Sequence, residues 1–349
     1  MHITMRSLRW SRLGLRCDTR NPEESEKFFV DKRDDHFIIF GGSSHGQLTA
    51  EICARLNVPP GRISLGKFAD GETKVRIFDE PRGADCYLIQ SMPDGGKSSD
   101  FVMETMLAVA ALRRASAKSV TVVLPYVPYA RRKGPSVLPG LLAASGVDRV
   151  VCVELDGGAE GWFDAPVANI DAQGVAVRYF INRPDLRGDI AVVSPDGKST
   201  MKAKKFWQRL QAHGLTSSLA TLLTDGPFEF LVGSVRGKDC ILIDECVDSG
   251  EKILKASQAL KSRGARRIFV LATHATLTAE SRENIRLSPI VELVTTNTVA
   301  TPHGFENEKV RVLSVGALLA EAVRRVQAKE SVTGLFECAT VDALLDPRS

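Results

Sequence analysis

From His36 onward, short apolar runs rich in Val and Ile alternate with stretches of helical periodicity, and this alternation restricts the fold more than any other feature. In the stretches between the runs, apolar residues recur on one stripe, as Leu48, Ile52 and Leu56 do. The first set of runs comprises residues 37–40, 87–89, 120–124 and 150–153. Continuous apolar strands joined by helices are typical of parallel sheets that are covered on both faces.

The order of strands and helices starts again in the second half of the chain. The second set of runs comprises residues 190–193, 240–243, 267–271 and 290–294. Two such sets predict two similar α/β domains that meet near residues 178–189. The expected divisions are an extension at residues 1–35, an N-terminal domain at residues 36–180, a C-terminal domain at residues 181–337 and a tail at residues 338–349.

The composition excludes several classes of binding partner and of structural site. Of its 349 residues, 44% are hydrophobic and 25% are charged, which is typical of a globular protein. The formal net charge of +4 is too small to indicate nucleic-acid binding, and no apolar run approaches the roughly 18 residues of a membrane span. The seven cysteines lie singly, so we expect neither a zinc site nor disulfides. The same pattern favours a reducing compartment.

The first 20 residues differ in character from the rest. They contain five arginines interleaved with apolar residues, and Asp18 is their one acid. This make-up is typical of a mitochondrial presequence, although a basic, disordered extension has the same composition. We expect a cytoplasmic protein, with a mitochondrial location as the alternative.

One stretch, residues 240–252, predicts a binding site. Its apolar run is followed by acids and small residues, namely Asp244, Glu245, Asp248, Ser249 and Gly250. A helical pattern begins after them. Carboxylates at the end of a strand suit ribose hydroxyls or Mg²⁺. Hydroxyl groups and the free N–H groups of a helix N-terminus suit a phosphate. The stretch therefore predicts a sugar-phosphate site.

Several segments, taken in order, resemble the ribose-phosphate pyrophosphokinases, which are also called phosphoribosyl pyrophosphate synthetases. The matching segments include residues 41–45, 67–72, 81–83, 125–131, 193–196, 232–238, 244–250 and 330–336. The resemblance spans about residues 36–337. It implies two tandem type I phosphoribosyltransferase-like domains, each a mostly parallel sheet flanked by helices. It also implies transfer of a diphosphoryl group from ATP to ribose 5-phosphate with Mg²⁺, giving phosphoribosyl pyrophosphate and AMP.

The ATP-binding residues follow from this resemblance. Phe68, Asp70 and Glu72 match a clamp for the adenine base and its ribose. The alternative is a β-turn at residues 69–71 with Phe68 in the core. Arg131 and Arg132 are the expected contacts of the ATP phosphates, and Arg131 is the one residue expected to act in catalysis. The segment after Arg131 is several residues shorter than the family pattern.

The metal site departs from the family, because Glu154-Leu-Asp156 stands where the resemblance implies Asp-Leu-His. We expect Asp156 and Asp196 to bind Mg²⁺ in a weakened site. Glu251 and Lys252 replace a Gly-Thr pair beside the predicted sugar-phosphate site. A glutamate repels a phosphate, and its Cβ obstructs the close approach that glycine permits. Ribose 5-phosphate is therefore expected to bind weakly, although Lys252 could offset the charge of Glu251.

The largest departure concerns the catalytic loop. The resemblance implies a Lys-x-Arg pair between the strand near Leu219 and the segment that begins at Val232. Residues 220–231 contain no Lys, Arg or His. Cationic contacts of this kind are worth on the order of 10³–10⁵ in rate. The interval thus predicts weak or absent catalysis.

The regulatory segments are retained. Arg82, Ser331 and Phe336 match positions that the resemblance assigns to a phosphate or ADP site at subunit contacts. Alternatives are a surface-turn role for Arg82 and a core role for Phe336. His45 and His274 lie in motifs that packing or turn geometry explains as well as chemistry does.

These patterns favour a weakly active or inactive regulatory subunit of a synthetase complex in nucleotide biosynthesis. It would bind ATP or ADP and form homo-oligomers, or hetero-oligomers with an active relative. One alternative is an active ribose-phosphate diphosphokinase with substitute cations, drawn from a neighbouring subunit or from Arg132, Lys133, Lys198 and Lys202. Another alternative is a sensor that binds ATP or ADP without turnover.

Overall fold

The computed structural model describes residues 36–91, 98–129, 136–155, 158–186, 188–225, 228–301, 309–336 and 344. The predicted extension at residues 1–35 lies outside the described residues, and so does nearly all of the tail. No helix in the described ranges is long and apolar enough to cross a membrane.

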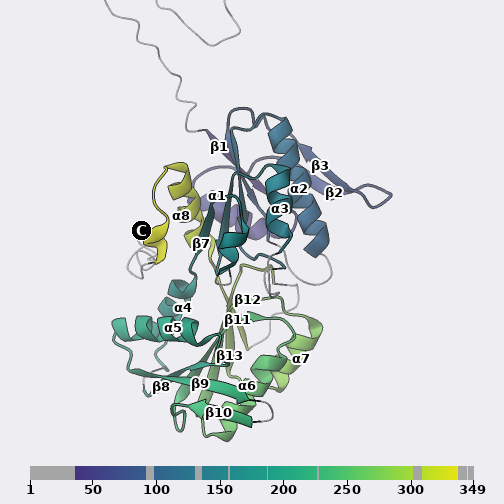
Figure 1. The fold of residues 1–349 in the computed structure, drawn as a ribbon. Coiled ribbons are helices and arrows are strands. Elements are labelled where there is room, and N and C mark those ends of the chain that lie inside the picture. Colours follow the sequence, from purple (N-terminus) through teal and green to yellow (C-terminus); the bar gives the residue numbers. More distant parts are fainter. Residues whose placement is uncertain are drawn as a thin grey trace, which may run out of the picture. The chain divides into compact units, whose positions relative to one another are not determined.

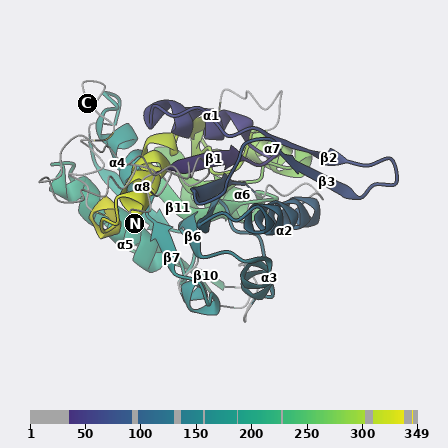
Figure 2. The ribbon, with the colours of Figure 1, turned by 90° about the horizontal axis from the view of Figure 1, so that it is seen from above.

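The first half of the chain forms a five-stranded sheet, because each predicted apolar run pairs with the next. Its strand order is β1-β4-β5-β6-β7, and every pair is parallel. The strands are β1 (Phe37–Gly41), β4 (Asp85–Ile89), β5 (Ser119–Leu124), β6 (Arg149–Val153) and β7 (Val167–Ile170). Helices α2 (Ser98–Arg114) and α3 (Leu138–Ser145) bury their apolar residues against one face, and α1 (Gly46–Arg55) against the other (Figures 1 and 2).

A two-stranded hairpin was not foreseen from the sequence. Strands β2 (Ile63–Lys67) and β3 (Thr73–Ile77) pair antiparallel, with Lys67 opposite Thr73. Their residues alternate between half-buried and exposed, so one side of the hairpin packs against α2. The tip projects from the body of the molecule (Figure 2).

The second half forms a seven-stranded sheet in the order β10-β9-β8-β11-β12-β13-β14. All of its neighbouring strands are parallel except β9 and β10. The strands are β8 (Ile190–Ser194), β9 (Ser217–Asp225), β10 (Phe228–Val232), β11 (Asp239–Val247), β12 (Arg267–Ala275), β13 (Glu292–Thr296) and β14 (Val310–Leu313). The helices between them are α5 (Thr200–Ala212), α6 (Glu251–Ser262) and α7 (Ala279–Leu287), and α4 (Gln173–Ile181) precedes β8. Two mostly parallel α/β layers confirm the predicted fold class.

The end of the chain returns to the first sheet. Helix α8 (Gly316–Gln327) buries Leu318 and Leu319 in the same core as Ile39 and Leu48 of the first half. Tyr87 of β4 donates a 3.0 Å hydrogen bond to Gln327 Oε1. The core of the first sheet is therefore completed by residues that lie far along the sequence.

Candidate active site at the carboxyl ends of the strands

The predicted sugar-phosphate segment lies at the carboxyl edge of the second sheet, but its strand is longer than expected. The sequence predicted that the strand would end before Asp244. Instead β11 continues to Val247, because its backbone stays paired with β12 as far as Ala275. Asp244 thus lies within the strand with a side chain only 6% exposed.

Lys252 connects two acids at this edge. It lies in the first turn of α6, and its Nζ is 2.9 Å from Asp244 Oδ1 and 2.6 Å from Asp196 Oδ2. Asp196 follows β8, which pairs directly with β11. The backbone N–H of Ser199 donates to the other carboxylate oxygen of Asp196 at 2.8 Å. The sequence suggested that Lys252 offsets Glu251, but Glu251 pairs with Lys255, one helical turn further on.

Burial and pairing act against each other at these groups. Burial raises the pKa of Asp244 by more than Lys252 lowers it. Burial also opposes ionisation of Asp196, but the hydrogen bonds from Lys252 and Ser199 outweigh it and lower the pKa of this carboxyl. For Lys252 itself, burial is outweighed by Asp244 and Asp196, which raise the pKa of the ammonium. Lys252 is therefore held in its charged form.

The turn that follows β11 keeps a regular shape. The backbone N–H of Ser249 donates to Asp248 Oδ1 at 2.7 Å, and Asn284 Nδ2 donates to Ser249 O at 2.8 Å. Gly250 starts α6 with a φ of 76°, a left-handed conformation that favours glycine. The structure thus brings the predicted residues 244–250 together in one strand-turn-helix unit.

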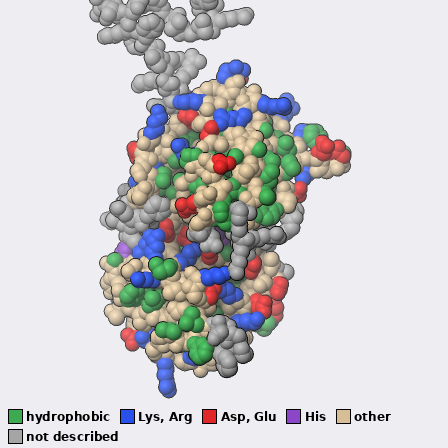
Figure 3. Space-filling model, viewed as in Figure 1, with side chains coloured by type: hydrophobic (Ala, Val, Ile, Leu, Met, Phe, Trp, Pro, Cys, Tyr) green, Lys and Arg blue, Asp and Glu red, His purple; other side chains and the backbone are tan. Residues whose placement is uncertain are grey.

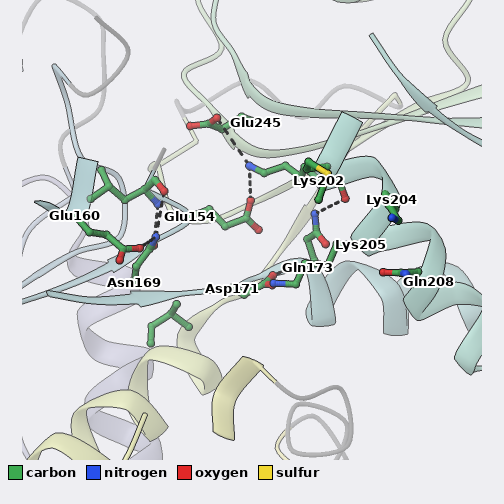
Figure 4. Close-up of a pocket in the computed structure, with 13 residues that line it drawn as sticks. Glu154, Glu160, Asn169, Asp171, Gln173, Lys202, Lys204, Lys205, Gln208 and Glu245 are labelled. Atoms are coloured by element: carbon green, nitrogen blue, oxygen red, sulfur yellow. Dashed lines mark hydrogen bonds and ion pairs between the residues drawn. The ribbon is translucent and has the colours of Figure 1, made fainter. Parts of the chain in front are cut away.

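A second acidic group lies where the two halves meet. Glu154 follows β6 with a φ of 46°, and its side chain is 6% exposed. Lys202 of α5 places its Nζ 2.8 Å from Glu154 Oε2 and 4.0 Å from Glu245 Oε2, and Figure 4 shows it between the two acids. Apart from this ion pair, neither carboxylate oxygen of Glu154 has a hydrogen-bond partner among the described residues.

These groups line a cavity of about 630 Å³. The first half contributes Glu154 and Asp171 to its wall, and α5 contributes Lys202 and Lys205 (Figure 4). Asp171 pairs with Lys205 and accepts two hydrogen bonds from Arg209, at 3.1 and 2.9 Å. Burial opposes ionisation of Asp171, but Arg209 and Lys205 outweigh it and lower its pKa. The cations of α5 thus hold the two halves together across the cavity.

The two histidines that the sequence singled out also join the halves. His45 Nδ1 accepts from the N–H of Leu48 at 3.4 Å, so Nε2 donates to Asn297 O at 2.9 Å. Burial lowers the pKa of His45, in keeping with a neutral ring. His274 Nε2 lies 3.1 Å from Val153 O. Each imidazole binds the backbone of the opposite half, which is a packing role.

The predicted ATP clamp lies at the tip of the β2–β3 hairpin. Phe68 is 50% exposed, so the alternative of a core position for it is not what the structure has. Lys74 Nζ lies 5.5 Å from the centre of its ring. Asp70 Oδ1 accepts from the N–H of Glu72 at 3.1 Å, which forms the turn of the hairpin. The remaining predicted ATP contacts, Arg131 and Arg132, lie outside the described residues.

The predicted Mg²⁺ site is not assembled from the described residues. Asp156 lies outside them, and both carboxylate oxygens of Asp196 already have partners in Lys252 and Ser199. The described ranges hold no group of three or more His, Cys, Asp or Glu side chains that could hold a metal ion. In the described part of the chain, the ammonium of Lys252 and the N–H of Ser199 therefore hold the oxygen atoms of Asp196 that a divalent cation would need.

Among the described residues, no hydrogen bond or ion pair joins Arg82 to Ser331. Arg82 is exposed, and its Nε lies 3.7 Å from Glu80 Oε1. Ser331 Oγ donates to Thr333 Oγ1 at 3.0 Å. Phe336 ends a short 3₁₀ helix, and its side chain lies outside what is described. Its neighbour Leu335 is fully buried.

A β-hairpin occupies the interval in which the resemblance implies the catalytic loop. Strands β9 and β10 pair antiparallel from Thr221 opposite Val232 to Asp225 opposite Phe228. Residues 226–227, between the strands, and the side chains of residues 224–229 are not described. The backbone of the interval is therefore committed to a sheet edge and not to a long loop.

Sequence reasoning missed the site roles of Glu154, Asp171 and Lys205, and it treated Lys202 only as a spare cation. One signal was available. Lys202 and Lys252 each lie in the first turn of a helix, where the macrodipole disfavours a cation. Such a position indicates that carboxylates lie close by.

Two tandem, mostly parallel sheets flanked by helices place the chain in the phosphoribosyltransferase-like class of α/β proteins. Two family models match the chain. Residues 37–136 match the N-terminal domain of ribose phosphate pyrophosphokinase, and residues 216–337 match the phosphoribosyl synthetase-associated domain.

Individual relatives agree. The ribose-phosphate pyrophosphokinase of Clostridium perfringens is 35% identical over 320 residues, which cover 88% of this chain and 100% of the relative. That of Bacillus subtilis is 36% identical over 314 residues, covering 87% and 98%. The crystal structure of phosphoribosylpyrophosphate synthetase from Mycobacterium smegmatis superposes with a TM-score of 0.78 at 31% identity, covering 84% of this chain and 99% of that one. The chain belongs to the ribose-phosphate pyrophosphokinase family.

Proposed function

We propose that this protein is a family member with little or no synthetase activity of its own, which acts as a regulatory subunit beside an active relative. The observation that carries the proposal is the β9–β10 hairpin. Transfer of a diphosphoryl group requires cations around the developing charge. Residues 220–231 contain none, and residues 220–225 and 228–231 belong to the two paired strands. No side chain from this interval can supply the missing contact.

Two lysines that could substitute, Lys202 and Lys252, are already engaged in ion pairs. Lys202 pairs with Glu154 and lies near Glu245, and Lys252 pairs with Asp244 and Asp196. Lys198 is exposed in the turn after β8 and has no ion pair among the described residues. A transition state at this edge would have to break ion pairs of buried acids to recruit Lys202 or Lys252. This cost supports weak catalysis over an alternative set of catalytic cations.

The surface supports association with a partner subunit. Exposed apolar side chains gather on α2, α3 and the residue before α3: Met103, Leu107, Val137 and Leu141. Figure 3 shows hydrophobic side chains over these helices. The exposed tip of the β2–β3 hairpin presents Phe68, Asp70 and Glu72 for ATP or ADP. The same proposal assigns ribose 5-phosphate, weakly bound, to residues 244–250, and regulatory phosphate or ADP to Arg82, Ser331 and Phe336.

The decisive test is AMP formation from ATP and ribose 5-phosphate, with Mg²⁺ and phosphate, by the purified full chain. The expected rate is at least a thousandfold below that of the Bacillus subtilis relative assayed in parallel, because the cationic contact is absent. A rate comparable to that of the relative would overturn the proposal. Co-expression with an active family member from the same source should then give a stable complex whose turnover per active subunit differs from that of the active member alone.

A further inference from the structure

The pair Asp196–Asp244 has the geometry of a cation site. Asp196 follows β8, and Asp244 lies in the carboxyl-terminal half of the neighbouring parallel strand β11, so their carboxylates reach the same point at this edge of the sheet. At that point lies Lys252 Nζ, 2.6 Å from Asp196 and 2.9 Å from Asp244. Two aspartates that converge in this way are oxygen ligands of the type that Mg²⁺ prefers. Here an ammonium of the same chain lies between them.

The position of Lys252 makes the pairing specific. A cation in the first turn of a helix is disfavoured by the macrodipole of α6, and only nearby anions make the position favourable. Burial around Asp244 further weakens solvent screening of the pair, since its side chain is 6% exposed. The ammonium is tethered beside its acids, so a competing ion meets an effective concentration on the order of millimolar or more.

The same device recurs once along this edge. Lys202 lies in the first turn of α5 and pairs with Glu154, with Glu245 at 4.0 Å. In both βα units, after β8 and after β11, a lysine at the helix start therefore meets buried carboxylates. The recurrence indicates that the chain neutralises this edge with its own lysines.

We propose that Lys252 takes the place of a divalent cation between Asp196 and Asp244, so that this edge of the second half is independent of Mg²⁺. The inference rests on the proposed function only in taking this edge as the ligand edge. It adds that the edge is closed to metal by a covalently attached charge. Lys252 thus determines which ion the site holds.

The test is a titration of the full chain with Mn²⁺ in the absence of substrate. Electron paramagnetic resonance measures binding as the loss of the signal of free Mn²⁺. The wild type should show no saturable site that depends on Asp244, so Asp244→Asn should leave its titration unchanged. Lys252→Ala should gain one saturable Mn²⁺ site, and this site should bind Mn²⁺ at least tenfold more tightly than any binding seen in the wild type. Adding Asp244→Asn to Lys252→Ala should remove it again.

The matched control is Lys255→Ala, which removes a lysine of the same helix that pairs with the exposed Glu251. It should bind Mn²⁺ as the wild type does. Circular dichroism establishes that each variant is folded. If Lys252→Ala does not fold, Lys252→Thr is used in its place. Two results would overturn the proposal: wild-type binding that is lost in Asp244→Asn, or a folded Lys252 variant that gains no site. Neither depends on turnover, so this test and the AMP assay can fail separately.

Discussion

The two ends of strand β11 treat a buried aspartate in opposite ways. At the amino end, Asp239 is 1% exposed and receives hydrogen bonds from Arg266 and Arg267 at 2.5–3.1 Å. Burial alone would raise its pKa, but the two guanidinium groups outweigh it and lower the pKa to about 2. At the carboxyl end, Asp244 has one lysine, and burial wins, so its pKa is raised.

The difference separates stability from binding within one strand. Two arginines satisfy the lone pairs of Asp239 from fixed directions, which leaves no role for a ligand. A single flexible ammonium satisfies Asp244 incompletely and leaves oxygen lone pairs at the edge where α/β proteins bind ligands. The amino end is therefore built for the fold, and the carboxyl end retains the capacity to bind.

The largest expected effect comes from breaking the amino end. Asp239→Ala should lower the free energy of unfolding by about 3 kcal/mol, because it leaves two clustered guanidinium groups without their shared anion. Urea unfolding at pH 7 measures the change. Asp185→Ala is the control, because Asp185 is 42% exposed and also pairs with Arg267. A loss in Asp185→Ala as large as that in Asp239→Ala would contradict the assignment of stability to Asp239.

Lowering the pH should change the contributions of Asp239 and Asp244 to the free energy of unfolding in opposite directions. The folded-state pKa of Asp239 is depressed from 3.8 to about 2, so its contribution is present above pH 3.8 and is lost as the pH falls toward 2. The contribution is roughly 2 kcal/mol. The stability difference between wild type and Asp239→Asn should therefore shrink on acidification. The raised pKa of Asp244 works the other way, because its contribution is lost as the pH rises.

Urea unfolding of both asparagine variants between pH 3 and pH 7 tests these signs. The difference between wild type and Asp244→Asn should move in favour of the wild type as the pH falls. Parallel changes in the two variants would mean that the ends of β11 do not differ as described.

The smallest expected effect is at the carboxyl end. Lys252→Ala should cost about 1–2 kcal/mol at pH 7, because it leaves a buried carboxylate with less compensation. The double variant Lys252→Ala with Asp244→Asn should recover most of this loss, since no buried charge remains unpaired. A double-mutant cycle in urea measures the coupling. A coupling near zero would show that Lys252 and Asp244 act independently.

The sequence predicted the parts of the fold that depend on local pattern. The apolar runs of both halves became strands of the two sheets. The β2–β3 hairpin was missed, because its residues alternate over only five positions per strand and carry few β-branched residues on the exposed side. The return of α8 to the first core was missed, because burial against a distant sheet leaves no local signal.

For the site, the acids of β11 could be predicted and the partner of Lys252 could not. The acids follow an apolar run, which is a local pattern. That Lys252 reaches Asp196 depends on β8 lying next to β11, and strand order is not written in local periodicity. The side-chain contacts of Phe336 and the positions of Asp156, Arg131 and Arg132 stay predictions, because they lie outside the described structure.

The packing of α8 has a consequence for synthesis on the ribosome. The strands of the first sheet emerge first, yet the face that holds Ile39 and Leu48 is closed only when residues 316–327 have been translated. The half that is made first is therefore finished last, and the second half folds while its predecessor still exposes an apolar surface. A nascent chain released before Gly316 would lack the part of the core that α8 supplies on the α1 face of the first sheet, whereas the core under α2 and α3 contains no residue of α8.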